Sequence, residues 1–163
     1  MTTPAHGPVP DKMTSLTTYL FFNGDCQTAI EYYQTIFGAE PIGHPVFCPD
    51  GKTVIHMMLK VGNACLMLAD TQPGSWEKGP EEFATAGLWM YVPDCDSLFE
   101  KAVDGGCEVL LSLTDAFWGD RFGKVKDPFG HCWSIATHKF DISHDELEQA
   151  REKWIQSMKS ENE

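Results

Sequence analysis

The sequence has little positive charge and no long apolar run. Lysine and arginine together number 12 against 24 aspartates and glutamates, which gives a formal net charge of −12. Such a surface repels the phosphates of nucleic acids and of anionic membranes, so we expect neither as a partner. Apolar runs such as residues 19–22 are far shorter than the roughly 20 residues that a membrane-spanning helix needs.

The cysteines also lack the spacings that would indicate a metal or disulfide framework. The six cysteines form no C-x-x-C pair and no Cys/His cluster with zinc-finger spacing. The N-terminus has no basic region followed by an apolar core, which is the pattern of a secretion signal. These absences favour reduced, buried thiols in a cytoplasmic protein.

The composition that remains is that of an ordinary folded protein. Of its 163 residues, 42% are hydrophobic and 22% charged, which suffices for one domain or for two small fused halves. Residues 1–13 are rich in Pro, Thr and Gly without periodicity, and we expect them to be a disordered lead-in.

An internal repeat organises the chain between this lead-in and residue 140. Each half predicts a strand, a helix and three more strands, with a Pro/Gly-rich linker at residues 71–83. The corresponding positions are Asp25 and Asp94 at an offset of 69, Gly62 and Gly130 at 68, and Cys65 and Cys132 at 67. One helix covers only one face of a sheet, so two such units can enclose a cleft between their other faces.

The predicted elements have clear boundaries. Asp25 and Asp94 are suited to begin the helices, and Gly38 and residues 105–106 to end them. The expected strands cover residues 16–22, 40–44, 54–60, 64–69, 88–92 and 108–113, followed by a last hairpin around residues 127–130.

The two hairpins predict which side chains share a face. Gly62-Asn63 is a two-residue turn, which places Val61 opposite Ala64 and Met58 opposite Met67. In the second half, Asp-Pro-Phe-Gly at residues 127–130 is a four-residue turn. That turn predicts Arg121 opposite Ala136 and Gly123 opposite Ser134. Arg121 would then share a possible pocket face with Cys132, Ser134 and Ala136.

Residues 141–163 are expected to form a C-terminal helix and tail. Ser143 and Glu146 match a capping box for a helix over residues 143–158. Its apolar stripe consists of Leu147, Ala150, Trp154 and Met158. We expect the stripe to pack on the domain or on a second subunit, with binding of another partner as the alternative.

Three segments resemble the vicinal-oxygen-chelate superfamily, which includes glyoxalase I, bleomycin-resistance proteins and extradiol dioxygenases, and within it the PhnB-like branch. They are residues 16–20 (LTTYL), residues 29–39 (AIEYY leading to FGA), and residues 118–131 (WGDR leading to DPFGH). The resemblance implies an α+β fold of two tandem βαβββ modules, with the C-terminal helix added, and usually a homodimer. It implies one domain over residues 14–140, with module 1 at about 14–72 and module 2 at about 84–140. Some members of the branch carry a methyltransferase label, but no nucleotide-binding glycine loop follows a strand here.

Metal-dependent members of this superfamily hold a divalent cation with four strand residues, typically His and Glu. When the four ligand positions of the family are mapped onto this sequence, they fall on Thr18, Met67, Gly87 and Ser134. None is a strong ligand for a hard or borderline cation, and neither are their immediate neighbours. We therefore expect no metal at the usual positions and no cofactor. A non-standard zinc site remains an alternative, with the residues His56, Cys65, Cys132 and His138.

The expected cleft is rich in aromatic and methionine side chains, as in sites for small molecules. The predicted ligand-binding residues are Arg121, Trp89, Tyr91, Trp118, His56, Met67, Ser134 and Thr18. Arg121 is the best candidate to bind an anionic ligand, because a guanidinium pairs with a carboxylate through two parallel bonds. Its alternative is a structural ion pair, with Asp120 or Glu31. The sequence thus predicts a metal-free binding protein for a small aromatic or anionic molecule. The alternatives are an enzyme with a non-standard metal site or acid/base groups, and a dimeric interaction module.

Overall fold

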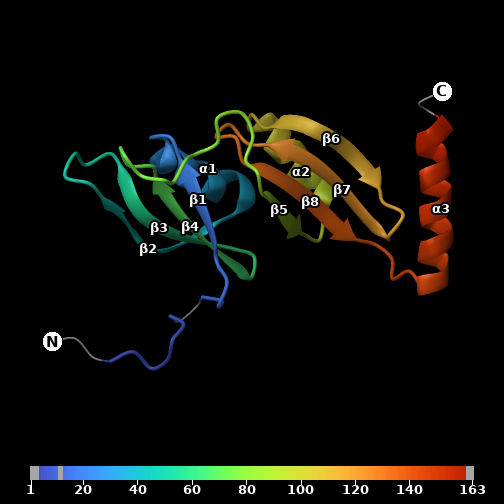
Figure 1. Ribbon diagram of the computed structural model, residues 1–163, viewed down its shortest axis with the longest axis horizontal. Coiled ribbons are helices and arrows are strands. Elements are labelled where there is room, and N and C mark those ends of the chain that lie inside the picture. The colour runs from blue at the N-terminus through green and yellow to red at the C-terminus, as the bar shows by residue number, and fades with distance from the viewer. Residues whose placement is uncertain (1–3, 11–12, 161–163) are drawn as a thin grey trace. The chain divides into compact units, whose positions relative to one another are not determined.

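The chain folds into two compact units, Met1–Ala84 (unit 1) and Thr85–Glu163 (unit 2), in a computed structural model (Figure 1). The structure describes residues 4–10 and 13–160, and side chains as far as residue 157. Parts of the expected lead-in (residues 1–3 and 11–12), the side chain of Met158 and residues 161–163 lie outside this description. Each unit contains the predicted order of strand, helix and three strands.

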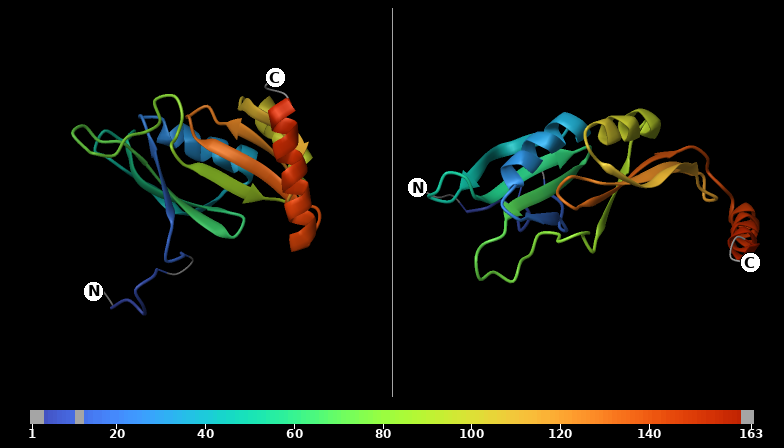
Figure 2. Two further views of the ribbon diagram at one scale, coloured as in Figure 1. Left: turned by 45° about the vertical axis from the view of Figure 1, so that its right-hand side comes forward. Right: turned by 90° about the horizontal axis from the view of Figure 1, so that it is seen from above.

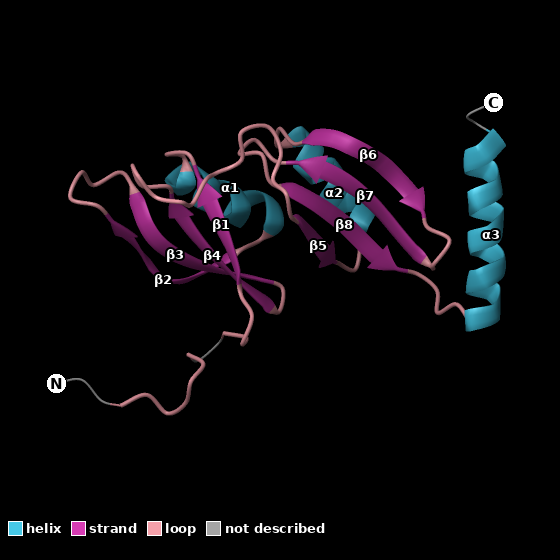
Figure 3. Ribbon diagram, in the orientation of Figure 1, coloured by secondary structure: helices cyan, strands magenta, loops and turns pink. Residues whose placement is uncertain are grey.

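Unit 1 is a four-stranded sheet with one helix against it. Its elements are β1 (Thr18–Phe22), α1 (Cys26–Phe37), β2 (Glu40–Phe47), β3 (Val54–Val61) and β4 (Ala64–Asp70). The strand order is β1-β4-β3-β2, and β1 runs parallel to β4. Figure 3 shows α1 along one face of this sheet. Between helix and sheet lie buried residues that include Phe22, Tyr33, Leu59 and Leu68.

The start of α1 differs from the sequence prediction. Asp25 precedes the helix, but its side chain makes no capping hydrogen bond. The buried carboxylate of Asp70, at the end of β4, accepts the backbone N–H groups of Gly24, Cys26 and Val54 at 2.8–3.0 Å. A carboxylate at a helix N-terminus is favourable, and here it also ties α1 to two strands. Gly38 ends the helix as predicted, in a left-handed conformation with φ of 66°.

Unit 2 repeats this arrangement. Its elements are β5 (Gly87–Tyr91), α2 (Cys95–Asp104), β6 (Glu108–Asp115), β7 (Asp120–Lys126), β8 (Cys132–His138) and α3 (His144–Ser160). The strand order is β5-β8-β7-β6, and β5 runs parallel to β8. Asp94 caps α2 as predicted, since its side chain accepts the N–H of Ser97 at 3.1 Å. α2 covers one face of the sheet, as two further views in Figure 2 show. We call the face of each sheet away from its own helix the open face.

The two hairpins differ in loop length, and this changes which residues share a face. In the first hairpin the predicted register is confirmed, with Val61 opposite Ala64 and Met58 opposite Met67. In the second hairpin the prediction is wrong by one residue, because Arg121 pairs with Thr137 and Gly123 with Ile135.

The cause of this shift is the turn at residues 127–130. The N–H of Asp127 bonds to the carbonyl of His131 at 2.9 Å, so three residues rather than two connect the strands. Gly130 takes a φ of 92°, as the last residue of a three-residue hairpin loop commonly does. A shift of one residue moves every side chain of β7 to the other face. The open face of β7 therefore carries Phe122 and Lys124, and Arg121 lies on the side of α2.

β1 also presents a different face from the one expected. Leu20 and Phe22 pair with Leu68 and Asp70, and the ring of Phe22 contacts Tyr33 of α1 at 6.2 Å between centroids. Thr18 alternates with them and lies on the helix side, so its expected place in a cleft is wrong. Tyr19 and Phe21 occupy the open face of unit 1 instead.

The remaining predictions concern the C-terminal helix and the thiols. Ser143 and Glu146 form the predicted capping box ahead of α3, with reciprocal hydrogen bonds. The stripe residue Trp154 contacts Phe117 of unit 2 with ring centroids 5.4 Å apart. All six cysteines are free thiols, and four of them are buried. Among the described residues, no helix has the length and apolar character needed to cross a bilayer.

Candidate functional site

Four aromatic rings gather on the open face of unit 2. Phe122 stacks on Trp89 with centroids 5.1 Å apart and lies 5.4 Å from Trp118, while Tyr91 lies 6.2 Å from Trp89. Trp89 and Phe122 belong to β5 and β7, with β8 between them. Ser134 and Ala136 are the β8 residues in register with them, and their small size lets the rings meet above the strand.

Three of these rings remain accessible. The exposed fractions are 42% for Trp89, 60% for Tyr91 and 37% for Trp118, whereas Phe122 is buried beneath them at 6%. Large exposed apolar groups in one place mark a surface that is suited to binding. The sequence-predicted residues Trp89, Tyr91, Trp118 and Ser134 are therefore brought together here.

A buried carboxylate holds this cluster in place. Asp120, only 2% exposed, accepts hydrogen bonds at Oδ2 from the hydroxyl of Tyr91 (2.8 Å) and the indole N–H of Trp118 (2.9 Å). Its Oδ1 lies 2.7 Å from Nδ1 of His138. Burial raises the pKa of Asp120, but the hydrogen bonds from His138, Tyr91 and Trp118 outweigh this and lower it. Asp120 therefore stays ionised and orients two of the exposed rings.

His138 connects this network to the segment that leads to α3. Its second nitrogen, Nε2, lies 3.0 Å from the carboxylate of Asp141. With an acceptor at each ring nitrogen, the doubly protonated imidazolium satisfies both contacts. The hydrogen bonds to Asp120 and Asp141 accordingly raise the pKa of His138.

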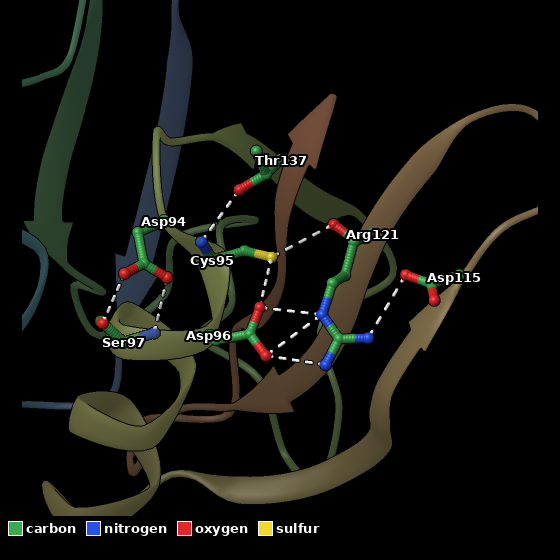
Figure 4. Close-up of polar contacts among 7 residues, drawn as sticks. All are labelled: Asp94, Cys95, Asp96, Ser97, Asp115, Arg121 and Thr137. Carbon is green, nitrogen blue, oxygen red and sulfur yellow. Dashed lines mark hydrogen bonds and ion pairs between the residues drawn. The ribbon is translucent and has the colours of Figure 1, made fainter. Parts of the chain in front are cut away.

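Arg121 takes no part in this face. Its guanidinium lies on the α2 side and donates to both carboxylate oxygens of Asp96, with Nη2 to Oδ1 at 2.7 Å (Figure 4). Nη1 donates to Asp115 at 3.3 Å. Arg121 is thus held in a structural ion pair, although with partners other than Asp120 and Glu31. The same ion pair lowers the pKa of Asp96.

The open face of unit 1 carries a second, smaller cluster. Tyr19 stacks on Phe21 with centroids 4.7 Å apart, and its hydroxyl lies 3.3 Å from Nδ1 of His56. The ring of Trp76, 84% exposed, meets Phe21 edge-on at 6.4 Å. Met67 lies on the same face, in register with Tyr19. The predicted residues His56 and Met67 therefore share the open face of unit 1, whereas Thr18 does not lie on it.

Neither unit offers the donors that the resemblance assigns to a metal. After the correction of β1, the four open-face positions hold Tyr19, Met67, Gly87 and Ser134, none of which is His or Glu. Within the part of the chain that the structure describes, no three His, Cys, Asp or Glu side chains come together to hold a metal ion. The residues thus do not fit the usual metal.

The residues of the non-standard zinc alternative also have other roles. His56 bonds to Tyr19, and His138 bonds to two aspartates. Cys132 and His138 are the first and last residues of β8, so they stand at opposite ends of one strand. Each unit by itself therefore offers no more than two separated donors of this set.

Sequence reasoning missed several residues of these faces, namely Phe122, Lys124, Asp120, Tyr19 and Phe21. For β7 a signal existed, because Asp-Pro-x-Gly also suits a three-residue loop, which places Phe122 and Lys124 on the open face. For β1 no signal existed. Residues 19–22 are all apolar, so alternation does not show which of them face the helix.

Comparisons with known proteins agree with this arrangement. A model of the Glyoxalase/Bleomycin resistance protein/Dioxygenase superfamily matches residues 15–135. An uncharacterized protein of Mycobacterium bovis is 35% identical over 131 residues, which cover 77% of this chain and 85% of that protein.

Two solved structures share the fold. Protein PA1353 from Pseudomonas aeruginosa has a TM-score of 0.62 at 24% identity, covering 78% of this chain and 99% of its own. The PhnB protein from Bacillus cereus, described as a putative 3-demethylubiquinone-9 3-methyltransferase, has a TM-score of 0.62 at 20% identity, covering 76% and 99%. Its fold agrees with the resemblance to the PhnB-like branch. Taken with the family match, the paired βαβββ units mean that this chain belongs to the Glyoxalase/Bleomycin resistance protein/Dioxygenase superfamily.

Proposed function

We propose that this protein binds a small aromatic or anionic molecule on the open face of unit 2, without a metal at the usual positions. The observation that carries this proposal is the accessible ring cluster of Trp89, Tyr91 and Trp118. Two of these rings, Tyr91 and Trp118, are already oriented by the buried carboxylate of Asp120, so they lose little conformational freedom when a ligand stacks on them.

The polar groups around the rings support a binding role. Ser134 lies in the centre of the face and His138 at its end, so a mostly apolar surface carries a few polar groups, as small-molecule sites do. We include His56 and Met67, on the open face of unit 1, among the proposed ligand-binding residues. Thr18 and Arg121 are not included, because both lie on the helix side of their sheets.

The alternative is an enzyme that uses acid/base groups of the same face. The contacts of His138 and Tyr91 with Asp120 favour it, because such a network can hold a proton close to a bound ligand. The two functions differ in turnover. A binding protein returns its ligand unchanged, whereas an enzyme changes it, and mass spectrometry of the recovered ligand distinguishes the two.

The test uses matched tryptophan variants. A thermal-shift screen of small aromatic acids and antibiotics identifies ligands, and calorimetry measures their affinity. We expect Trp89→Ala to weaken binding at least about tenfold, while Trp154→Ala, which changes an exposed tryptophan of α3 that lies on neither open face, leaves it nearly unchanged. Equal affinity of wild type and Trp89→Ala, with both proteins folded by circular dichroism, contradicts the proposal. So does a stoichiometric metal that survives dialysis against a chelator and is needed for binding.

We also propose a cytoplasmic homodimer with one family-type domain over residues 14–140, following the family resemblance. Neither nucleic acid nor membrane is proposed as a partner, because the net charge of −12 disfavours both. Sedimentation velocity at several protein concentrations tests the dimer, and a single monomeric species at the highest concentration contradicts it.

A further inference from the structure

The basic residues on the open face of unit 2 differ in whether they have a partner. Lys126 pairs with Glu108 at 2.7 Å, and His138 with Asp120 at 2.7 Å. Lys124 is exposed and has no hydrogen bond or ion pair within the described part of the chain. Among the described residues of this face, Lys124 is therefore the basic residue that forms no ion pair with a carboxylate.

Lys124 stands in one row with Ser134 and Trp89. It is in register with Ser134 of β8, which is in register with Trp89 of β5. Residues directly opposite on neighbouring strands have side chains about 5 Å apart. An ammonium group, a hydroxyl and an indole ring thus follow one another across three adjacent strands, and Leu111 of β6 continues the row beyond Lys124.

Ser134 adds to this row a hydroxyl without a partner among the described residues. The residue as a whole is 9% exposed, and its register with Lys124 places its side chain on the open face. Its hydroxyl makes no hydrogen bond to any residue that the structure describes. A hydroxyl that forms no bond within the protein is free to bond a ligand atom or an ordered water.

Lys124 is not placed to protect a sheet edge. Lysines commonly protect edge strands from pairing with other chains. β7 is an interior strand, between β8 and β6, so it has no free edge to protect. Lys124 lies instead between a buried phenylalanine two residues earlier and an exposed leucine, Leu111, on the next strand.

We propose that Lys124 and Ser134 form the anion-binding part of the site, and that the ligand is a planar aromatic monocarboxylate whose ring stacks on Trp89. This deepens, and rests on, the proposed function. The ammonium of Lys124 donates to one carboxylate oxygen, and the hydroxyl of Ser134 donates to the other. One unpaired cation matches one negative charge, so a carboxylate fits better than a doubly charged phosphate group.

The experiment uses two probes of nearly equal shape, naphthalene-2-carboxylate and its neutral carboxamide, with calorimetry on the full chain. Wild type is expected to prefer the carboxylate about fivefold at low salt, and high salt should reduce this preference. Lys124→Gln abolishes the preference, and Lys124→Arg retains it. Lys101→Gln removes an equal charge from α2 and also retains it. Ser134→Ala lowers the affinity for the carboxylate probe, because it removes the hydroxyl that donates to one of the carboxylate oxygens.

The outcomes separate this inference from the proposed function. If both probes bind and Trp89→Ala abolishes their binding, but the preference is absent or survives in Lys124→Gln, then the assignment of Lys124 is wrong and the aromatic site stands. If neither probe binds, or if Trp89→Ala leaves both affinities unchanged, the aromatic site is wrong and the inference is wrong with it. Lys124 is exposed, so Lys124→Gln is expected to fold, and circular dichroism checks this.

Discussion

The guanidinium of Arg121 forms two parallel hydrogen bonds with the carboxylate of Asp96, Nε to Oδ2 at 2.8 Å and Nη2 to Oδ1 at 2.7 Å. This pairing ties β7 to the first turn of α2, and Asp115 adds a third contact from β6. The residue that looked best suited to bind an anion is therefore already bound within the protein.

The first prediction concerns Arg121→Gln. We expect affinity for an aromatic carboxylate to change less than about twofold, because the side chain lies on the opposite side of the sheet from the rings. The melting temperature should fall by about 2–4 °C, since Asp96 and Asp115 lose their partner. Calorimetry and thermal unfolding measure the two effects. A large loss of affinity in Arg121→Gln, with Lys124→Gln unaffected, would return the anion site to Arg121.

Gly123 makes a close approach between β7 and α2 that no other residue fits. A Cβ at this position would lie 2.5 Å from Cε2 of Phe99 and 3.2 Å from the carbonyl oxygen of Leu111. Gly123→Ala is expected to lower the free energy of unfolding by about 1–3 kcal/mol, because the buried ring must shift. Urea unfolding monitored by circular dichroism gives the value.

Gly87→Ala is the matched control, since both glycines lie in strands of the same sheet. A Cβ at Gly87 meets no heavy atom within 4 Å. Its effect on stability is expected to stay within about 0.5 kcal/mol. If Gly123→Ala and Gly87→Ala lowered the free energy of unfolding by similar amounts, Phe99 would not pack as closely on Gly123 as the distances above indicate.

Asp127 organises the turn that sets the register of β7 and β8. Its Oδ1 accepts the N–H groups of Phe129 and His131, both at 2.9 Å, and Oδ2 accepts the indole N–H of Trp133 at 2.9 Å. In Asp127→Asn, an amide NH₂ replaces one acceptor and faces at least one of these donors. We expect a loss of about 2–4 kcal/mol of stability in urea unfolding.

The control for Asp127 is Asp104→Asn, an exposed aspartate at the end of α2. It makes the same chemical change without a buried hydrogen-bond network and should be nearly neutral. If Asp127→Asn is equally neutral, the carboxylate does not hold the turn.

The fourth prediction concerns pH. The pKa of His138 is raised in the folded protein by hydrogen bonds to Asp120 and Asp141. Its stabilising effect is therefore fully present below the unfolded-state pKa of about 6.5 and is lost as pH rises through the higher folded value. Asp120 has a lowered pKa and stays ionised throughout this range, so it adds no opposing change.

The measurement is the difference in free energy of unfolding between wild type and His138→Gln from about pH 5.5 to about pH 8.5. This difference should shrink as pH rises above about 6.5. Asp141→Asn should weaken the pH dependence, because it removes one of the two carboxylates. A difference that is constant over the range, or that grows with pH, contradicts the protonated bridge.

Much of the fold followed from local signals in the sequence. The capping role of Asp94, the C-terminal glycine Gly38 and the two-residue turn at Gly62-Asn63 were each predicted and confirmed. These features depend on the conformational preferences of a few consecutive residues, so they can be recognised without knowledge of the rest of the molecule. The cap predicted for α1, Asp25, was wrong, because the carboxylate that accepts the N–H of Cys26 belongs to Asp70, 44 residues away in the sequence.

The sequence by itself determined the repeated order of strands and helices and the family. It also predicted that Trp89, Tyr91 and Trp118 belong to the candidate site. Only the tertiary structure decided which side of each sheet its helix covers, and therefore that Lys124 lies with these rings while Arg121 does not. The physical reason is the two-residue period of a β-strand. One added residue in the turn at Asp127 exchanges the two faces of β7, although local propensities barely change.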